Sequence, residues 1–164
     1  MLVIGIDPGT AITGFGLVRE TENGLDLVDF GAIRTPAGMP AEQRLLMLYQ
    51  EIKQILLLHR PDGAAVEKLF FRRNVTTAIA VGQARGVALL ALAEMGIPVG
   101  EYTPMAIKQA VAGWGGAEKL QVQEMVRALL QLDDIPHPDD AADALAVAIC
   151  HLHSHRLTNL LDDH

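Results

Sequence analysis

The amino-acid sequence predicts an α/β protein with a five-stranded mixed sheet flanked by helices on both faces. Two patterns carry this prediction: three strand-like segments open the chain, and helical and strand-like segments alternate after them. Size agrees with it, because 164 residues, half of them hydrophobic, are enough for one domain with its own core.

The first three strands are predicted from apolar, β-branched runs that turn residues separate. Leu2–Ile6 is a short apolar run that Asp7-Pro8-Gly9 ends. Thr13–Val18 and Leu25–Arg34 are the second and third strands, and Asn23-Gly24 between them is a hairpin signal.

Helices and strands then alternate. Ala41–Arg60 is predicted as a helix because its apolar residues recur at helical spacing, and Pro61-Asp62-Gly63 ends it. Ala64–Leu69 follows as a buried fourth strand, Val75–Met95 as a helix and Val99–Tyr102 as the fifth strand.

The remainder is predicted to be helical. One apolar stripe comprises Val122, Met125, Val126, Leu129 and Leu130. A final helix is expected to begin near Pro138 and to carry Leu145, Ala148, Ile149 and Leu152 on one face. We therefore expect a single domain over residues 1–157 and a flexible tail over 158–164.

Composition limits the classes of partner and the compartment. The net charge of −7 lowers the expectation of a nucleic-acid partner, but residues 64–127 hold seven basic and five acidic groups, so a local basic surface is compatible with it. The single cysteine, Cys150, suits a reducing cytoplasm. No signal peptide or membrane span is expected, because charges or glycines interrupt every apolar run.

Four carboxylates stand out by context. Asp7 closes the first strand, and Glu67 lies inside an apolar strand, where a charge is costly unless it is paired or bound to a metal. Asp140 and Asp143 are three residues apart at a helix start, so they share one face with Cβ atoms roughly 5–6 Å apart.

Each carboxylate also has an ordinary structural explanation. Asp7 could be a turn residue before Pro8, and Glu67 a strand-edge residue with a lysine partner. Asp140 and Asp143 could satisfy free N–H groups at the helix start. The combination is more specific: if the four side chains converge, divalent cations would relieve their repulsion, and oxygen ligands without histidine or cysteine favour Mg²⁺ or Mn²⁺. Two such ions suit phosphodiester hydrolysis.

Five segments resemble the RuvC family of Holliday-junction resolvases, in family order: Gly5–Thr10, Glu67–Phe70, Gly82–Gly86, Ala117–Val122 and Asp140–Leu145. The resemblance implies an RNase H-like fold with strand order 3-2-1-4-5 and strand 2 antiparallel. It also implies that Asp7, Glu67, Asp140 and Asp143 are catalytic ligands of two Mg²⁺ ions, which Mn²⁺ could replace.

The resemblance further implies a DNA substrate and partners. The expected reaction is a symmetric pair of nicks across a four-way DNA junction, which leaves 5′-phosphate ends, in recombination and repair. A homodimer and a branch-migration motor complex are the expected partners, and no membrane is expected.

Other residues gain roles only through the resemblance. Lys108 and Lys119 would lie near the scissile strand, and Phe70 would stack or wedge at the branch point. Arg72, Arg73 and Asn74 are predicted to contact phosphate. Phe70 could instead be a core residue and the lysines could be merely solvated. The acidic end of the chain departs from the basic tails of some family members.

One helix, one tryptophan and a group of histidines have other distinctive sequence contexts. The helix Val75–Met95 is small and apolar nearly all round, which indicates burial or a two-fold dimer contact with Gly82 and Gly86 at close approach. Trp114, between two glycines, is interpreted as a buried anchor rather than a base-stacking group. His151, His153 and His155 lack an evident third ligand, so a metal site there is not favoured.

Three alternatives remain open. A related RNase H-like nuclease could act on RNA–DNA hybrids or flaps with the same fold and metals. An actin-like phosphotransferase could share Gly5–Thr10, although such enzymes need two domains and this chain is short for that. A junction-binding module without catalysis is disfavoured, because carboxylates occupy all four positions.

Overall fold

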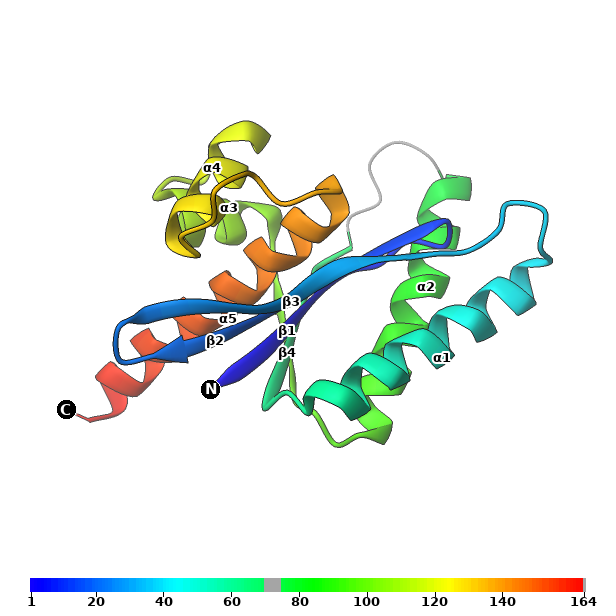
Figure 1. Ribbon diagram of the computed structural model, residues 1–164, viewed down its shortest axis with the longest axis horizontal. Helices are drawn as coiled ribbons and strands as arrows, with labels where there is room; N and C mark the ends of the chain where they lie inside the picture. Colours follow the sequence, from blue (N-terminus) through cyan, green and yellow to red (C-terminus); the bar gives the residue numbers. More distant parts are fainter. Residues whose placement is uncertain (70–74, 164) are drawn as a thin grey trace.

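The structure, a computed structural model, describes residues 1–69 and 75–163 and contains a five-stranded sheet (Figure 1). The strands are β1 (Leu2–Asp7), β2 (Ile12–Thr21), β3 (Gly24–Arg34), β4 (Gly63–Glu67) and β5 (Val99–Tyr102). Their order is β3-β2-β1-β4-β5. β2 is antiparallel to β1 and β3, whereas β1, β4 and β5 are mutually parallel, so the predicted order and the antiparallel second strand are confirmed.

Five helices in the described chain cover the two faces of this sheet. They are α1 (Ala41–His59), α2 (Val75–Glu94), α3 (Pro104–Ala112), α4 (Lys119–Leu129) and α5 (Asp139–Asp162). α1 and α2 pack on one face, and α5 crosses the other with α3 and α4 beside it (Figure 1). The predicted α/β class with helices on both faces is therefore confirmed.

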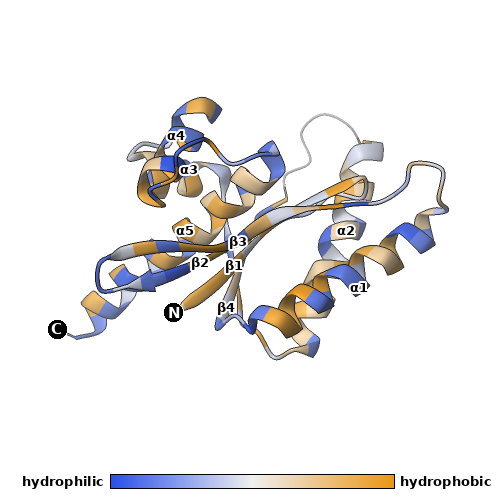
Figure 2. Cartoon of the chain, viewed as in Figure 1, coloured by the Kyte–Doolittle hydropathy of each residue, from blue (hydrophilic) through white to orange (hydrophobic). Residues whose placement is uncertain are grey.

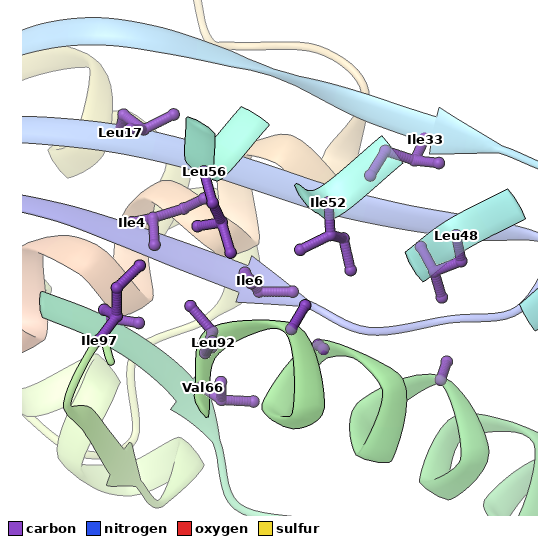
Figure 3. Packing of buried hydrophobic residues seen from close by; sticks show 14 of the residues in the cluster. Ile4, Ile6, Leu17, Ile33, Leu48, Ile52, Leu56, Val66, Leu92 and Ile97 are labelled. Atoms are coloured by element: carbon purple, nitrogen blue, oxygen red, sulfur yellow. The ribbon is translucent and has the colours of Figure 1, made fainter. Parts of the chain in front are cut away.

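The core on the α1/α2 face follows from strand alternation. Ile4 and Ile6 of β1 point to the same side and pack with the helix α1 residues Leu48 and Ile52 (Figure 3). In Figure 2, α1 carries both hydrophobic and hydrophilic residues, whereas β1 is mostly hydrophobic. The helix α1 can therefore pack one side on the core and expose the other to solvent.

Close approach on the opposite face depends on glycine. A β-carbon at Gly5 would lie 1.9 Å from the carbonyl oxygen of Ala144, and one at Gly14 would lie 2.0 Å from that of Asp140. No side chain fits there, so the backbone of α5 lies directly on β1 and β2. This contact fixes where the first turn of α5 ends up on the sheet.

Two segments have secondary structure that the sequence did not specify. α3 was not singled out from sequence, although Thr103 caps it by accepting a hydrogen bond from the Ala106 amide and Pro104 begins it. Residues 158–162 continue α5 as its last residues, and the expected flexibility of residues 158–164 stays a prediction. Extending a helix that is already formed costs little, which is why exposed residues continue it.

The helix α2 is buried on one side only. Ala84, Ala88, Ala91 and Leu92 are fully buried, whereas Val75, Ile79 and Leu90 are between 56% and 77% exposed. By length and composition alone, α2 could cross a membrane, but in this fold it packs against α1 and the sheet core. One side of this helix is therefore buried as expected, and a subunit contact through the exposed side stays a prediction.

Candidate active site

Asp7 and Glu67 are the last residues of neighbouring parallel strands. Ile6 pairs with Val66 in the register of β1 and β4, so the next residues, Asp7 and Glu67, stand side by side, with the strands about 4.8 Å apart. Gly5 and Ala65, two residues earlier, face α5. Side chains alternate along a strand, so both carboxylates point to the α5 face at the carboxyl edge of the sheet.

Asp140 and Asp143 reach the same edge from the first turns of α5. Gly14 is the cross-strand partner of Asp7 in β2, and its α-carbon lies against the backbone of Asp140. A side-chain hydrogen bond between Asp140 and Asp7 contributes to the raised pKa of Asp7. The structure thus brings the four predicted carboxylates together from β1, β4 and α5.

The electrostatics of the site are those of crowded like charges. Burial raises the pKa of Asp7 from 3.8 to about 7, and the charges of Asp143, Asp140 and Glu67 add to the shift. Burial also raises the pKa of Glu67, with Asp143 adding to it and Lys108 opposing it. A cation that binds among these carboxylates would relieve their mutual repulsion and so stabilise the folded protein.

The donor set fits a hard divalent cation, but the ligands are not gathered in advance. Within residues 1–69 and 75–163, no three Asp, Glu, His or Cys side chains stand together as a ready metal cage. The interactions that raise the pKa of Asp7 nevertheless reach it from all three other carboxylates. Carboxylates without a cation repel one another, so electrostatic coupling to Asp7 without a closed set of ligands is what a site lacking its cation should show.

Two lysines border the same hollow. A cavity of about 320 Å³ beside the carboxylates is lined by Glu67, Pro104, Ile107, Lys108, Lys119, Val122 and Asp143. Lys119 places its ammonium 3.6 Å from Asp143 and 3.3 Å from Asp139. Partial burial opposes charge on Lys119, but Asp143 and Asp139 outweigh it and raise the pKa of its ammonium.

A second hollow, of about 280 Å³, opens toward α2. Asp7 and Glu67 line it together with Lys68 and Arg85. The Arg85 guanidinium pairs with Glu101, and its buried Nε has no hydrogen-bond partner in the described chain. Glu67 belongs to both hollows, so the carboxylate edge is open on two sides.

Four of the predicted DNA-binding residues lie outside the described part of the chain, and one residue at the site was not predicted. Phe70, Arg72, Arg73 and Asn74 lie outside the described residues, so their roles stay predictions. Asp139 was missed, although its position beside Asp140 in a run of helix-start acids was the available signal.

Trp114 is exposed, and two of the histidines have hydrogen-bond partners. Trp114 is 54% exposed, so its interpretation as a buried anchor is wrong. The ring nitrogen Nδ1 of His151 is 2.8 Å from the Tyr102 hydroxyl, and that of His153 is 3.0 Å from the carbonyl oxygen of Ala110. Both histidines are thus engaged in structural hydrogen bonds.

Comparison with known proteins agrees with this geometry. Residues 3–151 match the family model described as crossover junction endodeoxyribonuclease RuvC. A relative of that description from Desulfitobacterium hafniense is 61% identical over 97% of this chain and 96% of its own. One from Chloroflexus aurantiacus is 62% identical over 94% of each chain. The structure of Thermus thermophilus RuvC in complex with a Holliday junction substrate superposes with a TM-score of 0.91 at 39% identity, covering 96% of both chains.

Proposed function

Because the chain belongs to the RuvC family of crossover junction endodeoxyribonucleases, we propose that it resolves four-way DNA junctions at the carboxylates Asp7, Glu67, Asp140 and Asp143. The family activity is hydrolysis of phosphodiester bonds, and the RuvC structure with a Holliday junction supports this class of substrate. Recombination and repair are the processes that such a reaction serves.

One observation carries the assignment of the site. The four carboxylates come from three elements and meet at one edge of the sheet, on one face, next to two lysines. A purely structural role would not require Asp7 to stand beside three other carboxylates in a position where burial, and secondarily their charges, raise its pKa to about 7. The arrangement is what binding of divalent cations would compensate.

We infer two Mg²⁺ ions per site, with Mn²⁺ as a substitute, held by these four carboxylates. When bound, they would supply an activated water and neutralise the leaving oxygen. The secondary structure sets where the ligand oxygens lie. Asp7 and Glu67 are held by the strands β1 and β4, and Asp140 and Asp143 by one face of α5. Lys108 and Lys119 line the same hollow as Glu67 and Asp143.

Lys119 and Lys108 provide the positive charge that DNA phosphate needs here. Both line the hollow that Glu67 and Asp143 also line, and the ammonium of Lys119 is within 3.6 Å of Asp143. They would hold the scissile phosphate against the carboxylate edge and stabilise charge that develops on it. The acidic remainder of the chain makes this local positive charge the more important.

Symmetric incision requires two such sites related by a two-fold axis. The exposed apolar side of α2, with Val75, Ile79 and Leu90, supports a homodimer through this helix. Gly86 lies on the same side with open space before it, which would allow close approach of two helices. A branch-migration motor complex and a cytoplasmic location complete the proposal on the strength of family membership.

The deciding experiment compares substrates. The protein is incubated with a mobile four-way junction, a linear duplex and an RNA–DNA hybrid, each with Mg²⁺ or with EDTA. Paired, ligatable nicks confined to the junction and to Mg²⁺ are the expected result. Cleavage of the hybrid instead would favour the RNase H-like alternative, and binding without any cleavage would favour a non-catalytic module.

Variants assign the chemistry to the site. Asp7→Asn should abolish cleavage and keep junction binding, because it removes a ligand charge while preserving shape. Asp26→Asn, an exposed carboxylate on β3, is the matched control and should cut like the wild type. Full activity of Asp7→Asn would overturn the proposed mechanism.

A further inference from the structure

The loop between α3 and α4 exposes the indole ring of Trp114 to solvent. Trp114 is 54% exposed, and it stands between Gly113 and Gly115. A β-carbon at Gly116 would lie 2.4 Å from the ring atom Cζ3, so one edge of the ring rests on the glycine backbone. The ring is therefore supported from within the loop while much of its surface is free.

Two constraints locate this ring near the catalytic hollow. Gly116 is three residues before Lys119, which limits the distance between their α-carbons to about 11 Å. The side chain of Met105 lies against Gly115, and Met105 is next to Pro104, which lines both hollows beside Glu67. The loop is thus tied, through Met105 and through Lys119, to residues that border the two hollows.

The surroundings favour a nucleic-acid ligand over a protein. Residues 64–127, which contain this loop, carry more basic than acidic groups, whereas the chain as a whole has a net charge of −7. Lys119, the first residue of α4, follows Trp114 by five residues and offers a partner for phosphate. An exposed indole with a cation close by is the combination by which proteins bind unpaired nucleotides.

We propose that Trp114 is a stacking platform for one unpaired base of the DNA strand that enters the carboxylate site. Because the loop lies close along the chain to Lys119 of the hollow, we expect the stacked base to lie a few nucleotides from the incised phosphate. Strands at a branch point have unstacked bases, so stacking there is cheaper than in duplex DNA. This inference rests on the proposed junction substrate.

The protein provides its own probe, because Trp114 is its single tryptophan. Intrinsic fluorescence is followed while a four-way junction is added in EDTA, and binding is measured separately by the anisotropy of labelled junction. Stacking predicts quenching that saturates with binding. A junction series with one abasic position each should restore the fluorescence at one or two neighbouring positions only.

Variants separate stacking from a role in shaping the loop. Trp114→Phe should bind the junction nearly as the wild type does, whereas Trp114→Leu and Trp114→Ala should each bind about tenfold more weakly. Leucine retains an apolar contact with Gly116, so its failure points to the aromatic face. Leu58→Ala, which removes another highly exposed apolar side chain, is the control and should bind normally.

The outcomes distinguish this inference from the proposed function. A wild-type protein that binds and cuts junctions without any change in fluorescence overturns the stacking role alone. Leucine and phenylalanine variants that bind equally well would do the same, since a loop-shaping role predicts that result. A fluorescence change on protein dilution without DNA would assign the ring to a protein contact. A wild type that neither binds nor cuts junctions removes both proposals.

Discussion

The α-carbon of Gly14 lies against the backbone carbonyl of Asp140, so close that a β-carbon would stand 2.0 Å from that oxygen. Gly14 is also the cross-strand partner of Asp7. A single glycine therefore sets the distance between the carboxylate that ends β1 and those that begin α5. The geometry of the site depends on a residue that carries no functional group.

Substitution of Gly14 by alanine should displace the start of α5. The clash is with backbone atoms, which no side-chain rotation relieves, so we expect a destabilisation of about 1–3 kcal/mol. A shift of about 1 Å at the carboxylates should lower the cleavage rate by about 100-fold. Gly38→Ala, where no heavy atom lies within 4 Å, is the control. Equal melting temperatures and rates for both variants would contradict this account.

The raised pKa of Asp7 predicts a pH-dependent stability without metal. The folded protein binds this proton up to a pH of about 7 and the unfolded chain only up to 3.8, so stability falls as pH rises through that window. The Asp7→Asn variant should not show this fall in the free energy of unfolding, which is at most about 4 kcal/mol at about 1.4 kcal/mol per pKa unit.

Urea unfolding in EDTA measures this effect. At pH 8 the Asp7→Asn variant should be more stable than the wild type, and the difference should vanish near pH 4. Mg²⁺ should stabilise the wild type more than the variant, since ligand binding to the native state adds to its stability. A variant that is no more stable at pH 8 would show that Asp7 carries no unfavourable charge.

Asp139 is expected to hold Lys119 at the site. Its carboxylate is 3.3 Å from the lysine ammonium and accepts a 3.2 Å hydrogen bond from Gln123. Once a cation engages Asp143, Asp139 is the remaining partner that keeps the lysine in place. Asp139→Asn should lower the cleavage rate several-fold with little change in junction affinity or melting temperature, because exposed ion pairs contribute about 1 kcal/mol or less.

A double-mutant cycle tests this role of Asp139. If it acts through Lys119, the Asp139→Asn substitution should have no further effect in a Lys119→Ala background. The control Glu124→Gln removes another exposed carboxylate, one that pairs with Arg127, and should leave the cleavage rate unchanged. Additive effects of the two substitutions would mean that Asp139 acts independently of the lysine.

The exposed side of α2 should control assembly. Leu90→Asp places a charge on the apolar surface and should yield a monomer in sedimentation at micromolar concentration with junction DNA present. Paired incision should be lost with the dimer. Leu58→Asp, an equally drastic change on α1, should leave the assembly intact. A wild type that sediments as a monomer with DNA would count against the two-fold arrangement.

Much of this architecture could be predicted from local patterns. The strand runs, the helical spacing in α1 and the acidic residues at special positions are visible within short windows of sequence. The burial of Ile4 and Ile6 on one side of β1 follows from the two-residue period of a strand. The resemblance of five segments to one family added the order of the strands.

The sequence by itself pointed to the four carboxylates, through the costly position of Glu67, the spacing of Asp140 and Asp143, and the resemblance of their segments to one family. Only the tertiary structure decided that they share one face, because this depends on the β1–β4 register and on the contact of α5 with Gly14. It also decided that Trp114 is exposed and that Asp139 meets Lys119. Local sequence specifies residue chemistry and periodicity, whereas distances between residues far apart in the chain arise from packing.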